Sequence, residues 1–343
     1  MRVALDASYS VDAQPSGIAV YSRELIRGLA SAYRQDHFVQ CYRPKQYLHA
    51  PGPICSNVSR RLLVPALPTF RADVFHALNQ RVDKRPARRV VSTFHDLFVI
   101  TSEYSTPEFR ARFTEQARQA AERSDLIIAV SQFTANQVSD LLKVERQRIR
   151  VIPHGVTVPS EQTERQRDKM VLFVGALQAR KNVKRLVEAF EVLPKPWRLV
   201  LAGAPTGFKA AEILKRVEAS PCRDRIDVTD YVSRERLHDL YAKASIFAFP
   251  SLDEGFGIPV LEAMAWGIPV LTSDGAALGE LAHGAALLVN PQNVSDIADG
   301  LTQLIQREDL REQLIQAGLQ RAAGFTWENT VRETYQVYRE LVE

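Results

Sequence analysis

The sequence predicts an α/β fold built from two successive doubly wound units, each a parallel sheet with helices on both faces. Short apolar runs recur along the chain, and segments with helical spacing separate several of them. Strands that are apolar throughout are typical of parallel sheets buried on both sides. The alternation stops at the polar segment 158–169, which looks like a linker, and then restarts. Because 343 residues also exceed one ordinary domain, we expect domains at 1–160 and 161–326.

The first domain holds six short apolar runs, each of which we expect to be a strand: 2–6, 37–42, 73–78, 89–94, 125–130 and 148–152. Helical patterns lie between several of these runs. In one of them Ile18, Tyr21, Leu25 and Leu29 share a face, which predicts an amphipathic helix after the first strand.

The second domain repeats this architecture without repeating the sequence. Its expected strands are the runs 170–175, 198–203, 225–229, 245–250, 268–273 and 286–290. A terminal helix over 327–343 follows, with Trp327, Val331, Tyr335 and Tyr338 on one stripe. Such a stripe must dock on a partner surface, but the period alone does not say on which domain.

Composition and charge place the chain among globular proteins. It is 45% hydrophobic and 24% charged, and its apolar runs are far below the ~20 residues of a membrane span. The N-terminus has no signal-peptide pattern, and three cysteines without metal spacing favour free thiols in a reducing cytoplasm. Residues 34–89 carry 11 basic and 3 acidic side chains. This basic region suits an anionic membrane surface or substrate, or it is a solubilising face.

The segment 250–270, PSLDEGFGIPVLEAMAWGIPV, carries the clearest chemical signal. It follows a predicted strand, and Pro259 suits the first turn of a helix running to about Trp266. Glycines before a helix N-terminus leave amide groups available to phosphate. Glu254 and Glu262 beside such a site suit sugar hydroxyls, which carboxylates accept well. The segment therefore predicts a nucleotide-sugar site. The alternative interpretation is that Glu254 and Glu262 are surface acids at the start of a helix.

Two cations follow the first strand of the second domain. In FVGALQARKNVKRLVEAF, residues 173–190, the strand ends at Gly175 and Asn182 is placed to cap the next helix. Arg180 and Lys181 then face the carboxyl edge of the sheet, where a diphosphate leaving group needs positive charge. Two solvated loop cations are the alternative interpretation.

Two weaker signals lie in the first domain. Gly17 opens a helix after the first strand, so that helix start is a candidate phosphate contact. His95 ends a strand in STFHDLF, where a histidine can position a sugar hydroxyl, or is simply a satisfied core residue like His76 and His154. No GxGxxG follows the first strand and no GxxxxGK[ST] occurs, which counts against a dehydrogenase and a P-loop enzyme. No DxD or His/Cys cluster suggests a divalent metal.

Taken together, these segments resemble glycosyltransferase family 4, the retaining nucleotide-sugar transferases of the GT-B fold. The resemblance covers most of the chain in the family's order, and the spacing Glu254-x7-Glu262 around Gly-Phe-Gly is its most specific part. It is closest to the bacterial envelope-polysaccharide branch, often mannosyl- or rhamnosyltransferases.

The resemblance implies two Rossmann-like domains facing across a cleft, with the helix 327–343 crossing back to the first. It also implies hexosyl transfer from GDP-mannose or a UDP-sugar to a glycan or lipid-linked acceptor, without metal or nucleic acid. In the family, Arg180 and Lys181 would contact the diphosphate, with Arg180 supplying its charge from a shifted position. Glu254 and His95 would contact the transferred sugar, and Glu262 the ribose. The remaining donor contacts would come from Gly17, Gly203, Val232, Gly255, Phe256 and Gly257.

Two rival functions stay open at this stage. One is another enzyme of the same fold, such as an epimerase or a glucan synthase. The other is a non-catalytic protein that binds a nucleotide-sugar or a glycan.

Overall fold

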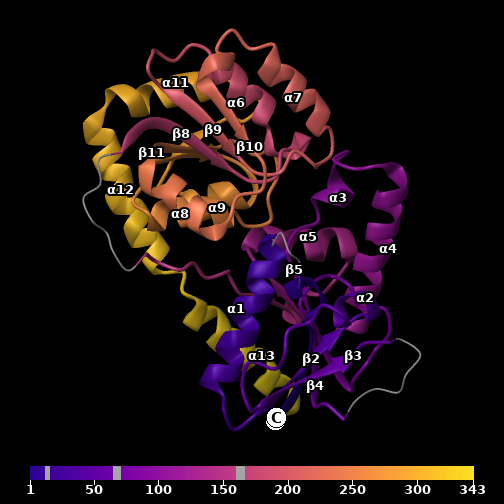
Figure 1. Cartoon of the computed structure of the whole chain (residues 1–343). Helices are drawn as coiled ribbons and strands as arrows, with labels where there is room; N and C mark the ends of the chain where they lie inside the picture. Colours follow the sequence, from indigo (N-terminus) through magenta and orange to yellow (C-terminus); the bar gives the residue numbers. More distant parts are fainter. Residues whose placement is uncertain (12–15, 65–70, 160–166) are drawn as a thin grey trace. The chain divides into compact units, whose positions relative to one another are not determined.

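The computed structural model describes residues 1–11, 16–64, 71–159 and 167–343, and it divides into two compact units (Figure 1). Unit 1 comprises Met1–Gly155 and Phe325–Glu343, and unit 2 comprises Val156–Gly324. Most of the expected linker 158–169 lies outside the described residues. Its last two residues, Asp168 and Lys169, are not linker but already belong to the first strand of unit 2.

Unit 1 contains a seven-stranded sheet in the order β3-β2-β1-β4-β5-β6-β7, and all its pairings are parallel. The strands are β1 (Arg2–Asp6), β2 (His37–Tyr42), β3 (Val58–Leu62), β4 (Val74–Ala77), β5 (Arg89–Phe94), β6 (Leu126–Ala129) and β7 (Ile149–Val151). Six were predicted within one residue at each end. The strand β3 was not predicted. It is an edge strand, and Arg60 and Arg61 in its exposed half interrupt the apolar run that is typical of a central strand.

Helices cover both faces of this sheet, as predicted. Successive residues of β1 point to opposite faces: Val3 and Leu5 join one buried cluster, and Ala4 joins the other. The helices are α1 (Gly17–Ala32), α2 (Pro44–Tyr47), α3 (Phe98–Thr101), α4 (Pro107–Arg123) and α5 (Gln132–Leu142), with 3-10 turns at Ser8–Val11 and Arg146–Arg148.

The terminal helix α13 (Trp327–Val342) docks on unit 1 beside α1. Val331, Tyr335 and Tyr338 of the predicted stripe are buried in the same cluster as Val3 and Leu5. This contact settles what the helical period could not, namely which unit receives the stripe.

Unit 2 contains a six-stranded parallel sheet in the order β10-β9-β8-β11-β12-β13. Its strands are β8 (Asp168–Val174), β9 (Arg198–Ala202), β10 (Ile226–Thr229), β11 (Ala244–Phe249), β12 (Val270–Ser273) and β13 (Leu287–Val289), all of which were predicted. In both sheets the chain first adds strands on one side of a central pair and then on the other side, which is the doubly wound arrangement.

Figure 1 shows α6, α7 and α11 over one face of this sheet and α8 and α9 over the other. The helices of unit 2 are α6 (Val183–Phe190), α7 (Ala210–Glu218), α8 (Arg234–Lys243), α9 (Ile258–Ala265), α10 (Ala276–Ala282), α11 (Val294–Gln306) and α12 (Glu308–Ala323), with 3-10 turns at Ala179–Lys181 and Arg223–Arg225. Among the described residues, no helix is both long and apolar enough to cross a membrane.

Candidate functional site

The residues of unit 2 that are predicted to contact a nucleotide-sugar lie where the strand order of its sheet reverses. The strands β8 and β11 are neighbours, but the chain leaving each continues toward the opposite end of the sheet. Open α/β sheets bind ligands at this switch point, outside the carboxyl ends of the strands. The 3-10 turn Ala179–Lys181 follows β8, and Glu254 follows β11. Two motifs that are over 70 residues apart in sequence are thereby brought together.

Glu254 holds both predicted cations. Its Oε2 lies 2.8 Å from the Arg180 guanidinium and its Oε1 lies 2.5 Å from the Lys181 ammonium. All three residues are less than 10% exposed. Burial alone raises the pKa of Glu254, but the two cations outweigh burial and lower the pKa to about 2. The carboxylate is therefore ionised at neutral pH, and the cluster carries one net positive charge.

Hydrogen bonds hold the loop after β8 against the loop after β11. The Leu252 amide donates to the Arg180 carbonyl at 2.8 Å. The Asn182 side-chain amide donates to the carbonyls of Pro250 at 2.9 Å and Pro291 at 2.6 Å. Asn182 is the N-cap residue of α6, as predicted, but its side chain makes no capping hydrogen bond to the helix, because it joins three loops instead. Because these hydrogen bonds join the loops that carry Arg180 and Lys181, the two cations have little freedom to move.

The ring of Phe249 contacts the Lys181 ammonium group. The ammonium nitrogen lies 4.4 Å from the centroid of the Phe249 ring, within the range of a cation–π interaction. Phe249 is the last residue of β11 and is fully buried, so its ring cannot move away. In the sequence Phe249 is recognisable only as part of an apolar strand, and nothing in its spacing indicates a lysine contact.

The glycine-rich turn leads into α9 as predicted. Gly255, Phe256 and Gly257 are buried, and Pro259 lies in the first turn of the helix, which ends at Ala265 with Trp266 as its C-cap. Gly257 has φ +114°, and a Cβ there would lie 2.6 Å from the Leu278 side chain. Both facts require glycine at position 257.

Glu262 lies one turn into α9 and is partly buried. Its Oε2 accepts a hydrogen bond of 2.9 Å from the Tyr241 hydroxyl. Burial raises the pKa of Glu262 to about 7, against the opposing effects of the Tyr241 hydrogen bond and the Arg234 charge. Tyr241 was not predicted as part of the site, because α8 places it beside α9 through tertiary packing rather than through a local pattern.

Gly203 and Val232 complete the same sheet edge. Gly203 follows β9, where a Cβ would lie 2.1 Å from the Gly175 carbonyl oxygen, so the chains leaving β8 and β9 touch. Val232 is partly buried in the loop between β10 and α8. The strand order β10-β9-β8-β11 therefore places Val232, Gly203, the cations and Glu254 along one edge, about 5 Å per strand.

Unit 1 holds the other two predicted residues. Gly17 is exposed and is the first residue of α1, and the Ser16 hydroxyl caps this helix by accepting from the Ala19 amide. His95 directly follows β5, as predicted, and is 6% exposed. His95 therefore stands at the carboxyl end of a strand of the first sheet, and Gly17 stands at the start of the helix that follows β1 in the sequence.

Protein groups contact both ring nitrogens of His95. Its Nε2 lies 2.9 Å from the Leu78 carbonyl oxygen, which can only accept, so Nε2 carries the proton. Its Nδ1 lies 3.3 Å from Nε2 of His154. Burial outweighs the contact with Leu78 and lowers the pKa of His95 to about 4, so the ring is neutral at pH 7. A sugar hydroxyl would have to displace one of these partners to form a hydrogen bond with a ring nitrogen of His95.

His76 behaves as a satisfied core residue. Its Nδ1 lies 2.7 Å from the Tyr338 hydroxyl and its Nε2 lies 2.8 Å from the Thr93 hydroxyl. It is fully buried, and burial lowers its pKa to about 3. Its role is therefore structural, and it ties the terminal helix to β5.

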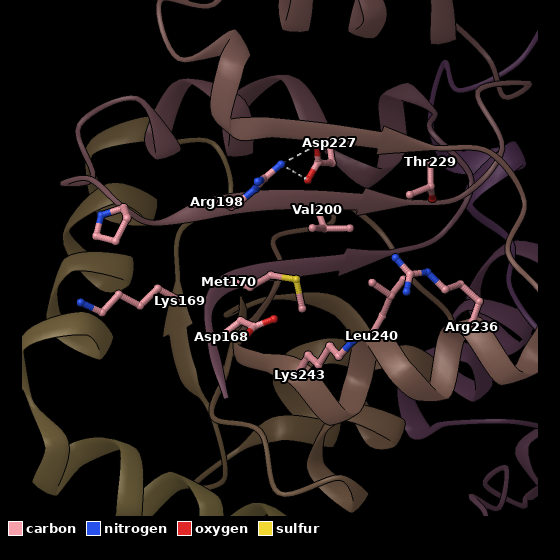
Figure 2. A pocket seen from close by; sticks show the side chains of 11 residues that line it. Asp168, Lys169, Met170, Arg198, Val200, Asp227, Thr229, Arg236, Leu240 and Lys243 are labelled. Atoms are coloured by element: carbon pink, nitrogen blue, oxygen red, sulfur yellow. Dashed lines mark hydrogen bonds and ion pairs between the residues drawn. The ribbon is translucent and has the colours of Figure 1, made fainter. Parts of the chain in front are cut away.

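A hollow of about 660 Å³ lies elsewhere on unit 2, between the strands β8 to β10 and helix α8 (Figure 2). None of the predicted site residues lines it. Its charges are largely matched: Arg198 pairs with Asp227, and Arg236 and Lys243 both pair with Asp239. Among the described residues, no three His, Cys, Asp or Glu side chains gather as a metal site would require.

Comparisons with known proteins agree with this architecture. The family model for Glycosyltransferase Family 4 matches residues 15–158, and that for Glycosyl transferases group 1 matches residues 157–321. The O-antigen chain mannosyltransferase B of Escherichia coli is 31% identical over 303 residues, covering 82% of this chain and 79% of the relative.

Two solved structures share the fold. Sucrose-phosphate synthase from Thermosynechococcus elongatus superposes with a TM-score of 0.79 at 21% identity, covering 99% of both chains. Anabaena HepE in complex with UDP and glucose superposes with a TM-score of 0.74 at 16% identity, covering 99% of this chain and 100% of HepE. Both units thus have the Rossmann-like architecture of the GT-B fold. The chain belongs to glycosyltransferase family 4 and is a glycosyltransferase.

Proposed function

We propose that this enzyme transfers a hexosyl group from a nucleoside diphosphate sugar to a hydroxyl group of a glycan or lipid-linked acceptor, with retention of anomeric configuration. The pathway would be the synthesis of a cell-envelope polysaccharide. The Arg180–Lys181–Glu254 cluster at the switch point of unit 2 carries this proposal. The E. coli relative named an O-antigen chain mannosyltransferase favours a GDP-mannose-like donor, and HepE bound to UDP and glucose keeps a UDP-sugar open.

The residues along the sheet edge of unit 2 match the parts of such a donor. The loop around Val232 would hold the base and Gly203 would allow close approach of the backbone. Glu262 would accept hydrogen bonds from the ribose hydroxyls. Arg180, Lys181 and the amides before α9 would neutralise the diphosphate without a metal. Glu254 uses one lone pair of each oxygen on the cations, so the remaining ones can accept from hydroxyl groups of the transferred sugar.

The chemical step is a front-face substitution at the anomeric carbon. The bond from that carbon to the β-phosphate oxygen breaks, and a bond to the acceptor oxygen forms on the same face. The departing diphosphate takes the acceptor proton. Because the acceptor oxygen attacks the anomeric carbon directly, no side chain acts as nucleophile. The fixed positive charge of Arg180 and Lys181 stabilises the negative charge that develops on the leaving group. Gly17 and His95 of unit 1 would also contact the donor.

A screen of nucleotide-sugars by thermal unfolding tests the donor. A donor present at a hundred times its Kd stabilises the native state by about 2.7 kcal/mol and so raises the melting temperature. We expect GDP-mannose or a UDP-sugar to raise it in EDTA, and we expect transfer to a glycan acceptor with that donor. Binding without transfer or donor hydrolysis would favour a non-catalytic binding protein instead, and an isomerised free donor would favour an epimerase.

We further propose that unit 1 docks on an anionic membrane surface at the cytoplasmic side. Part of the basic region 34–89 is paired with acidic side chains: Arg43 with Asp6 and Asp83, and Arg85 with Asp125. The part that supports docking is the segment from α2 to β3, which holds both exposed cationic and exposed apolar side chains. The exposed residues there are Lys45, Arg60, Arg61, Leu48 (82% exposed) and Ile54 (49%).

Vesicle sedimentation tests this docking. We expect the protein to bind vesicles containing phosphatidylserine, and binding to weaken with salt, because each basic residue near such a surface contributes about 1 kcal/mol that salt screens. Replacing Leu48 and Arg61 together by serine should abolish sedimentation, whereas replacing Lys184 on unit 2 should not. Equal binding by the double variant and the wild type would contradict the proposal.

A further inference from the structure

Tyr241 contacts the predicted ribose acid from a position that no ligand can reach. Its side chain comes from α8, is 1% exposed, and donates its hydroxyl proton to Oε2 of Glu262. Its ring stacks on Trp266 with centroids 6.2 Å apart and lies 6.0 Å from the Phe247 ring. The hydroxyl group therefore acts on the carboxylate and does not contact a ligand itself.

We propose that Tyr241 is a positioning residue, which holds the Glu262 carboxylate in the orientation that accepts the ribose hydroxyls of the donor. This inference rests on the proposed function of Glu262. The terminal torsion of a glutamate is broad and nearly two-fold, so an unheld carboxylate rotates freely. With Oε2 fixed by Tyr241, Oε1 and the second lone pair of Oε2 keep a defined direction. A pair of neighbouring ribose hydroxyls needs such a pair of acceptors.

The same hydrogen bond also controls protonation of Glu262. Burial raises the pKa of this carboxyl to about 7, while the Tyr241 hydroxyl and the Arg234 charge, both from α8, oppose that rise. The pKa of Tyr241 lies well above 10 because of its burial and the Glu262 charge, so the tyrosine remains a donor throughout the working range. Removing the hydroxyl group must raise the pKa of Glu262 further. Since only the ionised carboxylate accepts with both oxygens, donor binding should then require a higher pH.

The test compares Tyr241→Phe with the wild type by calorimetric titration of GDP-mannose and UDP-glucose between pH 5.5 and 9. Both ends of the diphosphate are esterified in these donors, so the charge of the diphosphate stays constant over this range. Comparing the two proteins with the same donor cancels the ionisation of the base that begins near pH 9. We expect the midpoint of the affinity profile to move upward by about one pH unit. Binding would then be about tenfold weaker at pH 6 and nearly unchanged at pH 9. Tyr42→Phe, which removes a buried hydroxyl bonded to Gln40 in unit 1, is the matched control and should bind as the wild type does.

A ligand-free measurement separates this proposal from the donor assignment. Carboxyl ¹³C shifts of labelled glutamate, assigned with Glu262→Gln, report the titration of Glu262 directly, and Tyr241→Phe should move it upward. An unmoved titration, or affinity lost equally at every pH, would leave Tyr241 a purely structural residue and overturn the inference. If Glu262→Ala binds donors as tightly as the wild type, the assignment of the ribose contact is wrong, even where the titration shifts as expected.

Discussion

Replacing Lys181 by alanine will lower kcat by about 10²- to 10³-fold, which is typical for losing one preorganised group that stabilises a developing negative charge. The Lys181 side chain is 10% exposed and is held by Glu254 and by the Phe249 ring, so under the proposed mechanism it needs no reorganisation when the diphosphate departs. Initial rates of hexosyl transfer at saturating donor and acceptor measure this effect.

The variant should remain folded, since Glu254 still has Arg180 as its ion-pair partner. Lys184→Ala provides the matched control. That lysine lies three residues further along, is exposed on α6, and should leave kcat within about twofold of the wild type. Near-normal transfer by Lys181→Ala, with Lys184→Ala equally active, would mean that the diphosphate leaves somewhere else.

Replacing Glu254 by alanine will destabilise unit 2 by about 3–5 kcal/mol, because it leaves two buried cations without their shared counter-charge. Urea unfolding of the variant and the wild type measures the difference. Glu188→Ala is the control, since it removes a half-exposed partner of Arg216 and should cost at most about 1 kcal/mol. A loss as small for Glu254 as for Glu188 would contradict the burial of this cluster.

The same cluster fixes the direction of the acid dependence. The pKa of Glu254 is about 2 in the folded protein, below its ordinary value near 4.5, so its contribution to stability is fully present above that value. This contribution will be lost as the pH falls from about 4.5 toward 2. Glu254→Gln should lack this part of the acid dependence while keeping the shape of the side chain.

The sequence predicted most of the fold because central parallel strands are apolar on both faces. Among the described residues, twelve of the thirteen strands were predicted, and β3 was not, because Arg60 and Arg61 in the exposed half of this edge strand interrupt the apolar run. The docking of α13 on unit 1 was open for a related reason. A helical stripe reveals that a face is buried, but it does not name the surface that covers it.

The candidate site was predicted residue by residue but not as an arrangement. Glu254 was assigned to a sugar and Lys181 to a diphosphate, whereas the structure joins both with Arg180 in one ion cluster. That joining depends on β8 and β11 being neighbours, and strand order is a tertiary property. The supporting contacts of Asn182 and Tyr241 are equally invisible in the sequence, because each reaches across to a different loop or helix.

A crystal structure of the protein with GDP or UDP, grown in EDTA, would test the central claim that fixed cations of unit 2 bind the diphosphate without a metal. We predict the diphosphate beside Lys181 and Arg180, with the ribose at Glu262 and the base near Val232. Nucleotide bound away from Lys181, or bound only once a divalent metal replaces the chelator, would contradict the account.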